Sequence, residues 1–283
     1  MKIAQGGCVT NEMIKRAARD KDIEVSPFLY FPCMVDIEKE GLNIPMSKIY
    51  EHDYVKGRAE TSKFVEKTID MDLNRKTLST YENSDADYII IELASLIFPA
   101  YKVYYNDKWV YSVNIEAPRC YEMLGLKYEK VELTDEIIYK GLNDFADYMR
   151  KKWDLNKIIL YKEPEPKFYM GEDGKVYSYP MGSYNYKSSV RLNRYIEYLY
   201  NLLPETKMFI NPSLQICNSL TDNPRHMTEE SKVLQSLVFR EFILHEDLEK
   251  EISEAQLTLQ KILQEKLVLS PITLIQRELY GSC

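Results

Sequence analysis

Short apolar runs alternate along the chain with longer segments of helical periodicity. The clearest runs predict strands over residues 2–5, 88–91, 157–161 and 207–211. The run at 88–91, Tyr-Ile-Ile-Ile, is continuous, which is typical of a parallel strand covered on both faces. Because helical stretches separate these runs, the pattern predicts an α/β fold, a three-layer α/β/α sandwich around a parallel sheet.

Amphipathic periodicity predicts helices over residues 57–69, 134–152, 188–203 and 228–245. Thr134 and Thr228 stand at the starts of two of these segments, where threonine is a favoured N-cap residue. A further apolar and aromatic run at 26–35 contains Pro27 and Pro32. These prolines predict a short strand or a strand at the edge of the sheet.

Two short segments predict β-hairpins inserted beside the main sheet. The segment 100–113 contains the turn pair Asn106-Asp107, and the segment 167–179 contains Gly171-Glu172-Asp173-Gly174. Residues 247–266 predict a separate amphipathic helix with a leucine face. We expect that face to pack on the preceding domain or on a second copy, which would form a homo-oligomer. The predicted organisation is an α/β domain over 1–245 and a C-terminal helix and tail over 246–283.

Composition and charge narrow the class of protein. The 283 residues are enough for one large domain or two small ones. The net charge is −7 and no block of the sequence is basic, which argues against a nucleic-acid partner. No apolar run approaches the roughly 20 residues that span a bilayer, and the N-terminus lacks the apolar region of a signal peptide. We therefore expect a cytoplasmic protein without a membrane span.

The five cysteines are odd in number, widely spaced and free of CxxC pairs. This spacing argues against a disulfide framework and against a structural zinc site. It agrees with reduced thiols in the cytoplasm. No metal ligand set and no permanently bound cofactor are predicted.

The first ten residues carry the most specific chemistry. A strand over 2–5 is followed by Gly6-Gly7, by Cys8, and by Thr10 as the predicted N-cap of a helix over 11–20. This arrangement places a thiol at the carboxyl end of a strand and near the positive end of a helix, which favours the thiolate. Ligands of open α/β sheets bind at that same edge. The alternative is that Cys8 is simply a small buried residue.

Other polar residues follow the ends of predicted parallel strands. Glu92 comes directly after 88–91, and Lys162 comes directly after 157–161. Because the carboxyl ends of parallel strands meet at one edge, we expect both to line the same cleft as Cys8. For Glu92, a capped or solvated position in a loop is the alternative.

His226 is the histidine best placed for catalysis. Of the three histidines, only His226 lies in a loop after a predicted strand and directly before a helix, with Asp222 and Asn223 upstream. A loop histidine by itself is more often a surface residue. Together with Cys8 it fits a nucleophile, a base and an orienting group.

The order of these motifs resembles the SGNH (GDSL-type) hydrolase superfamily. Gly6-Gly7-Cys8-Val9-Thr10 lines up with the GDS(I/L)T block of that family, which puts Cys8 at the nucleophile position. Asn223-Pro224-Arg225-His226 lines up with the late DxxH block, which puts His226 at the base position. Asn223 stands where an aspartate is usual, and Asp222 is the alternative orienting group.

The likeness is strongest to an uncharacterised SGNH-like family of bacterial polysaccharide and capsule gene clusters, whose members begin with a GSCVTRD-like string. It spans roughly residues 1–245 and includes the segments 87–93, 157–162, 173–174 and 192–194. The resemblance implies an acyl-sugar or other carbohydrate substrate and an acyl donor such as acetyl-CoA. It also implies a set of substrate-binding residues, namely Gly7, Val9, Glu92, Lys162 and Asn193.

The sequence departs from the SGNH pattern at several positions. The GxND block, whose asparagine is an oxyanion donor, is replaced by Glu92-Leu93-Ala94-Ser95. Gly7 replaces the residue before the nucleophile, and the block-two glycine has no clear match. Backbone N–H groups near Cys8 and Val9 could still form an oxyanion hole.

Two functions follow from these motifs. One is an acyl-transfer enzyme, an O-acyltransferase or esterase with a cysteine nucleophile, in polysaccharide biosynthesis. The other is a catalytically inactive SGNH-like binding module, which the missing oxyanion asparagine favours and the retained Cys8 and His226 oppose.

Overall fold

The structure is a computed structural model that describes most of the chain. The described residues are 1–5, 7–18, 22–28, 34–45, 69–113, 118, 121–122, 124–221 and 226–268. The chain divides into two compact units. The first consists of Met1–Lys15, Asp22–Lys162 and Leu192–Phe209, and the second of Arg16–Lys21, Glu163–Arg191 and Ile210–Cys283.

The main sheet has five strands, β1 (Lys2–Gln5), β2 (Glu24–Phe28), β3 (Tyr88–Ile91), β7 (Ile158–Lys162) and β10 (Lys207–Ile210). Their order is β10-β7-β3-β1-β2. β1 is parallel to both β2 and β3, and β3 is parallel to β7. The predicted α/β class with a mostly parallel central sheet is therefore confirmed. The order 2-1-3-4-5 is that of flavodoxin-like sheets.

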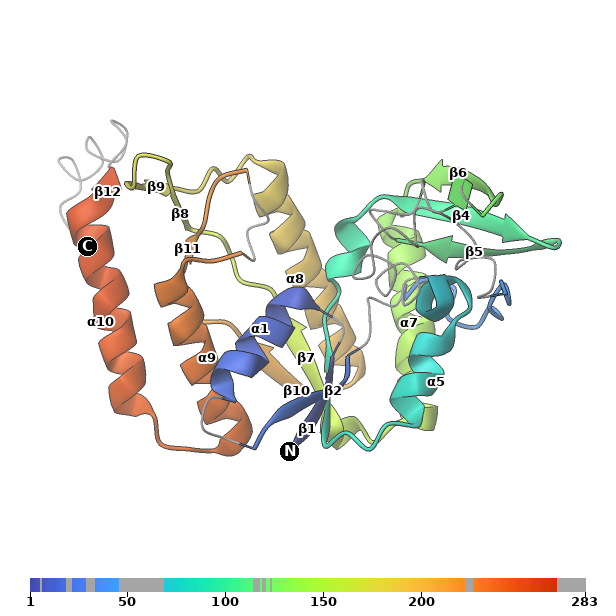
Figure 1. Cartoon of the computed structure of the whole chain (residues 1–283), viewed down its shortest axis with the longest axis horizontal. Helices are drawn as coiled ribbons and strands as arrows, with labels where there is room; N and C mark the ends of the chain where they lie inside the picture. The colour runs from blue at the N-terminus through green and yellow to red at the C-terminus, as the bar shows by residue number, and fades with distance from the viewer. Residues whose placement is uncertain are drawn as a thin grey trace. The chain divides into compact units, whose positions relative to one another are not determined.

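The pleat of these strands explains how the sheet is covered. Alternate residues, among them Ala4, Ile89 and Leu160, share a buried cluster with α7 (Asp135–Lys152) and α8 (Tyr184–Leu202). The residues between them, such as Ile3 and Ile90, face the other way and are also buried. Figure 1 shows α1 (Cys8–Ala17) to the left of the strands, and α5 (Lys76–Glu82) and α7 to the right. Helices thus flank the sheet, as continuous apolar strands require.

Helix α7 begins and ends as its sequence predicts. Thr134 is the N-cap residue, and its side-chain oxygen accepts a hydrogen bond from the Ile137 N–H at 3.4 Å. The first turn is acidic and the last turn is basic, which complements the helix dipole. Helix α8 begins four residues earlier than predicted, at Tyr184.

The edge strand β2 begins at Glu24, two residues before the predicted run, and is described as far as Phe28, because residues 29–33 lie outside the described residues. It forms one end of the strand order, as its prolines predicted. The helix predicted over 57–69 and His52 fall almost entirely outside the described residues. The chain is described again from the π-helix η1 (Ile69–Leu73). The other short helices are two 3-10 helices, η2 (Ala94–Ile97) and η3 (Leu155–Lys157).

The predicted hairpin at 100–113 is confirmed as β4 (Ala100–Tyr105) and β5 (Lys108–Ser112), which pair antiparallel. Its turn residues Asn106 and Asp107 have φ of 48° and 63°, the left-handed pair of a type I′ turn. A third strand, β6 (Lys127–Val131), pairs with β4 and was not predicted. The KYEKV sequence of β6 lacks an apolar run, so only tertiary context identifies it as a strand.

The second unit contains a four-stranded sheet of order β11-β8-β9-β12. The predicted hairpin at 167–179 is confirmed as β8 (Phe168–Met170) and β9 (Val176–Ser178). β11 (Ile216–Cys217) and β12 (Leu267–Val268) extend it, and helices α9 (Glu229–Leu244) and α10 (Glu249–Lys266) complete the unit.

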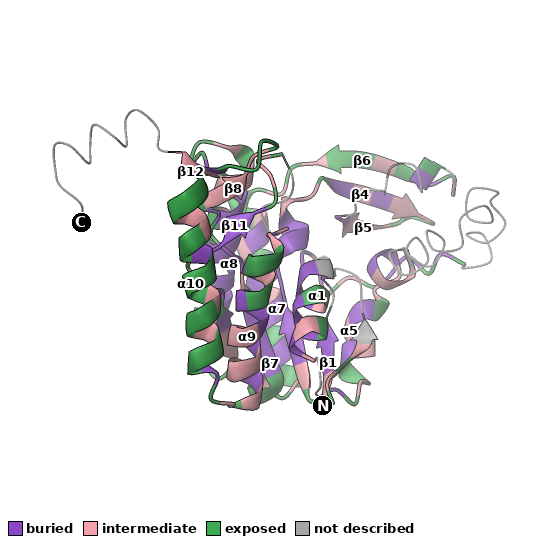
Figure 2. Cartoon of the chain, turned by 60° about the vertical axis from the view of Figure 1, so that its left-hand side comes forward, coloured by how far each residue is buried: buried purple, intermediate pink, exposed green. Residues whose placement is uncertain are grey.

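The leucine face of α10 packs within its own unit. Leu259 is fully buried in a cluster with Val176, Ile216 and Leu234. Figure 2 shows the outer side of α10 exposed. The prediction that this face finds a partner is confirmed, and the partner belongs to the same chain.

Candidate functional site

The turn from β1 to α1 carries the predicted nucleophile. The Asn11 N–H donates to the Gly7 carbonyl at 3.0 Å, which is the first hydrogen bond of α1. Gly7 is therefore the N-cap residue and Cys8 the first residue of the helix. The prediction that Thr10 is the N-cap is wrong. Thr10 lies in the first turn of the helix, and its hydroxyl donates a hydrogen bond to Oε1 of Gln5 at 2.5 Å.

Gly7 and Glu92 fit together as a pair. A Cβ added at Gly7 would lie 1.3 Å from Oε1 of Glu92, so only glycine leaves room for that carboxyl group. Glu92 follows β3, the strand beside β1, and is only 5% exposed. Glu92 is thus a buried residue against the turn, whereas the alternative placed it in a solvated loop.

This turn lies where the order of the strands reverses. β1 has β2 on one side and β3 on the other, and the chain crosses from one side to the other between them. Ligands of doubly wound sheets bind outside the carboxyl ends of the strands at such a switch point. Gly7, Cys8 and Glu92 follow the carboxyl ends of β1 and β3.

Tyr81 of α5 lies within the electrostatic reach of Glu92. Burial raises the pKa of Tyr81 well above its usual value, and the Glu92 carboxylate raises that pKa further. Tyr81 is 3% exposed, so its phenol stays neutral at physiological pH and does not act as a base.

The backbone of the first helical turn offers donors for an anion. The first N–H groups of any α-helix have no acceptor within the helix, and in α1 these belong to residues from Cys8 onward. Val9 is 7% exposed, so its side chain belongs to the core. The thiol of Cys8 lies outside the described part of the chain.

His226 lies in the second unit on a backbone that is fixed by pairing. The Asn218 N–H donates to the His226 carbonyl at 2.8 Å, and the Thr228 N–H donates to the Ile216 carbonyl at 2.9 Å. Between them, Cys217 and Met227 form an antiparallel bridge. The loop predicted around His226 is therefore held against β11.

Thr228 is the N-cap residue of α9, as predicted, although its hydroxyl bonds Oγ of Ser231 at 3.2 Å and makes no capping bond to the backbone. Asp222 and Asn223 lie outside the described residues. Cys8 belongs to the first unit and His226 to the second. The pairing of this cysteine with this histidine stays a prediction.

Two further predicted residues lie on the α8 side of the sheet. The ammonium group of Lys162 pairs with the carboxylate of Glu197 on α8 at 2.6 Å. Asn193, also on α8, is 4% exposed and follows the buried Leu192. Glu163, the residue after Lys162, is 3% exposed and was not selected from the sequence.

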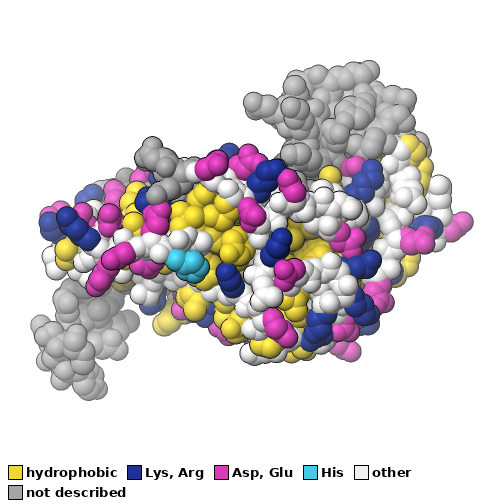
Figure 3. Space-filling model, turned by 90° about the horizontal axis from the view of Figure 1, so that it is seen from below, with side chains coloured by type: hydrophobic (Ala, Val, Ile, Leu, Met, Phe, Trp, Pro, Cys, Tyr) yellow, Lys and Arg dark blue, Asp and Glu magenta, His cyan; other side chains and the backbone are white. Residues whose placement is uncertain are grey.

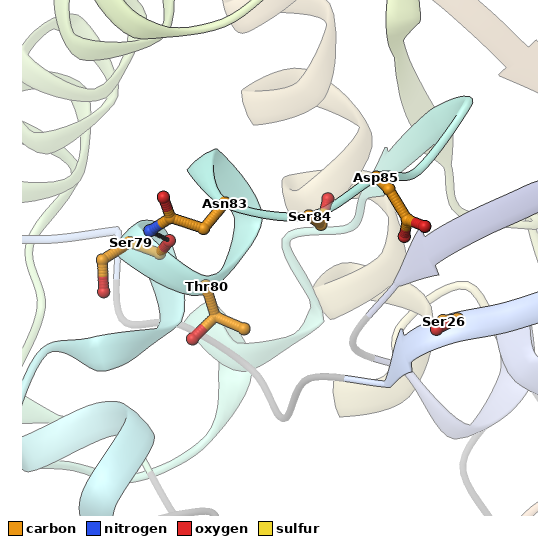
Figure 4. A pocket seen from close by; sticks show the side chains of 6 residues that line it. All are labelled: Ser26, Ser79, Thr80, Asn83, Ser84 and Asp85. Carbon is orange, nitrogen blue, oxygen red and sulfur yellow. Dashed lines mark hydrogen bonds between the residues drawn. The ribbon is translucent and has the colours of Figure 1, made fainter.

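The first unit also contains a pocket of about 470 Å³ (Figure 4). Its lining is polar and consists of Ser26, Ser79, Thr80, Asn83, Ser84 and Asp85. Ser84 and Asp85 precede β3, so the pocket belongs to the amino edge of that strand. The Ser79 and Thr80 hydroxyls both donate to the Lys76 carbonyl within α5. These two hydroxyls are therefore already bonded within their own helix.

Other kinds of site have no support among the described residues. They contain no group of three or more His, Cys, Asp or Glu side chains that could hold a metal ion. Every helix in the described ranges is too short or too polar to cross a membrane. Basic and acidic side chains are interspersed on the face drawn in Figure 3.

A scan against protein-family models, a search of curated proteins and a search of solved structures each found no match. The fold itself is an α/β arrangement with a mostly parallel central sheet flanked by helices. The likeness to SGNH hydrolases rests on the motifs of the sequence.

Gln5 is the residue beside this turn that the sequence analysis did not select. It ends β1, is fully buried, and its Oε1 accepts hydrogen bonds from both the Gly7 N–H and the Thr10 hydroxyl. The available signal was a polar residue at the last position of a buried strand.

Proposed function

We propose that the protein is an acyl-transfer enzyme of the SGNH-like type, an O-acyltransferase or esterase, with Cys8 as nucleophile. The observation that carries this proposal is the position of Cys8. It is the first residue of α1, two glycines after β1, at the switch point of the sheet. A cysteine at the N-terminus of a helix is favoured as a thiolate, which is the nucleophilic form.

In the proposed reaction, the His226 imidazole accepts the thiol proton and the sulfur attacks the acyl carbon. As the C–S bond forms, the carbonyl π electrons move to oxygen. The π bond then re-forms, the bond to the leaving group breaks, and the leaving group takes the proton from the imidazolium. Water or a sugar hydroxyl repeats these steps on the thioester and releases Cys8. Asn223 or Asp222 would orient the imidazole.

The substrate class follows from the resemblance of the sequence. We propose an acyl-sugar or another carbohydrate as substrate, in bacterial polysaccharide or capsule biosynthesis. A donor thioester such as acetyl-CoA suits a cysteine nucleophile, because thioester exchange passes the acyl group from one sulfur to the other.

A second function is a catalytically inactive SGNH-like binding module. The observation that favours it is the buried carboxyl group of Glu92, which opens the segment that replaces the GxND block and its oxyanion asparagine. An ionised carboxylate there would repel a developing oxyanion.

The test is release of p-nitrophenolate from p-nitrophenyl acetate by the full chain. Cys8→Ala should abolish the enzymatic release. His226→Asn should lower the rate on the order of 100-fold or more, as loss of a general base does. The double variant should be little worse than either single variant, because the residues act as one unit.

His245→Asn is the matched control for the histidine. His245 ends α9 with φ of 56°, a conformation that asparagine tolerates, so the replacement should leave the rate unchanged. If Cys8→Ala retains the wild-type rate while the fold is intact, the acyl-transfer proposal is wrong and the binding module is favoured.

A further inference from the structure

The side chain of Gln5 is tied to the turn that carries Cys8. Its Oε1 accepts hydrogen bonds from the Gly7 N–H at 2.7 Å and from the Thr10 hydroxyl at 2.5 Å. Gly7 is the N-cap residue of α1, and Thr10 lies in its first turn. Both bonds are buried, so the carboxamide of Gln5 is a fixed part of the helix N-terminus.

The other half of the same amide is the nitrogen Nε2. Among the residues that the structure describes, this buried donor has no acceptor. The two donors that converge on Oε1 require the oxygen at that position, so the nitrogen cannot be exchanged with it. Leaving a buried amide donor unpaired is unfavourable, and an acceptor that arrives with a ligand would complete it.

An acyl group transferred to Cys8 brings such an acceptor. Its carbonyl oxygen becomes negatively charged in the tetrahedral intermediate, and preorganised N–H donors stabilise that charge. The first N–H groups of α1 lack acceptors within the helix. Nε2 is bonded to the same carbon as Oε1, so it belongs to this turn.

We infer that Gln5 is the oxyanion donor that replaces the missing asparagine of the GxND block, an inference that rests on the proposed acyl-transfer function. Oε1 holds the turn, and Nε2 donates to the carbonyl oxygen as the C–S bond forms. The hydrogen bond weakens again when the π bond re-forms. Nε2 is buried in the acyl-free protein, so this bond forms as the turn adjusts to the acyl group, as catalytic hydrogen bonds commonly do.

The experiment compares two reactions of the same cysteine in the full chain. p-Nitrophenyl acetate acylates Cys8 through an oxyanion, whereas iodoacetamide alkylates it by displacing iodide and forms none. Both rates are measured at the pH plateau, where the thiol is fully ionised in every variant. Gln5→Glu keeps an oxygen for Gly7 and Thr10 and removes the N–H donor. Gln5→Met removes both, and Thr10→Val removes one turn bond only.

We expect acylation to fall on the order of 100-fold in Gln5→Glu and Gln5→Met, as for removal of one oxyanion donor. Alkylation should stay close to the wild-type rate in both. Thr10→Val loosens the Gln5 amide but keeps Nε2, so acylation should fall less than in Gln5→Met while alkylation stays close to wild type. If Gln5→Met does not fold, the comparison of acylation with alkylation in Gln5→Glu is the test.

Wild-type acylation in Gln5→Glu would overturn the inference, and so would an equal loss of acylation and alkylation, which would mean that Gln5 only shapes the thiol. If p-nitrophenolate release depends on Cys8 but not on Gln5, this inference alone fails. If release persists in Cys8→Ala, the proposed function fails and the inference falls with it.

Discussion

The two ends of the same pair of strands, β1 and β3, are built in opposite ways. At the amino end, Lys2 pairs with Asp85 at 2.5 Å, but the two side chains are 41% and 71% exposed. At the carboxyl end, Gln5 and Glu92 are buried, and the Glu92 carboxyl group fills the space beside Gly7.

The difference shows which polar groups limit the choice of residue. Exposed ion pairs contribute little, because water solvates the charges nearly as well and salt screens them. Buried polar groups depend on their neighbours, because no water replaces a lost contact. We therefore expect the carboxyl end to be intolerant of substitution and the amino end to be tolerant.

Gly7→Ala should have the largest effect. The added methyl group would lie 1.3 Å from Oε1 of Glu92, so the buried carboxyl group has to move. Overpacking of this kind destabilises by about 1–3 kcal/mol, and urea unfolding measures the loss. Gly182→Ala is the control, because a Cβ there meets nothing within 4 Å.

The double variant Gly7→Ala/Glu92→Ala sharpens this test. If the carboxyl group is the obstacle, the double variant should be more stable than the sum of the two single losses predicts. Strict additivity would mean that Gly7 is required for another reason.

Thr10→Val should have an intermediate effect. It removes one buried hydrogen bond to Gln5 and should destabilise by about 1 kcal/mol in urea unfolding. Thr258→Val on α10 is the matched control, because that exposed hydroxyl bonds only the Glu254 carbonyl of its own helix. Equal losses in both variants would contradict the contrast between buried and exposed hydroxyls.

Lys2→Met should have the smallest effect, visible mainly in the titration of Asp85. The hydrogen bond from Lys2 lowers the pKa of Asp85 below its usual value. Its stabilisation is therefore present above the unfolded pKa of 3.8 and is lost as the pH falls through the lower folded pKa.

In Lys2→Met, the pKa of Asp85 should rise toward 3.8 in an NMR titration, while the unfolding midpoint at neutral pH stays close to wild type. A large loss of stability at neutral pH would show that the amino end is not tolerant.

Much of the fold is predictable because its strands are continuous apolar runs. Tyr88–Ile91 and Ile158–Lys162 carry that signal by themselves. β11 and β12 have two residues each and β6 is largely polar. These segments become strands because they pair with neighbouring strands, which no local sequence pattern indicates.

The parts of the site that are formed by consecutive residues are predictable from the sequence. The strand, the glycines, the cysteine and the helix follow one another in the sequence. In the structure, the backbone of Cys8 lies after β1 and begins α1, as that order predicts. The fit of Glu92 against Gly7 joins residues far apart in the chain, so no local pattern indicated it. Thr10 was misplaced because threonine is a good N-cap, while the acceptor that holds it is a side chain of the preceding strand.

The place of β1 between β2 and β3 has a consequence for how the protein is made. β1 is synthesised before both of its neighbours. β2 follows soon after, but β3 comes more than eighty residues after β1 begins. Until then, Ile3 and Ala4 are exposed on a strand with one open edge, which is a template for pairing with other chains. Translation speed and chaperone supply over this interval should therefore govern the yield of folded protein more than the final stability does.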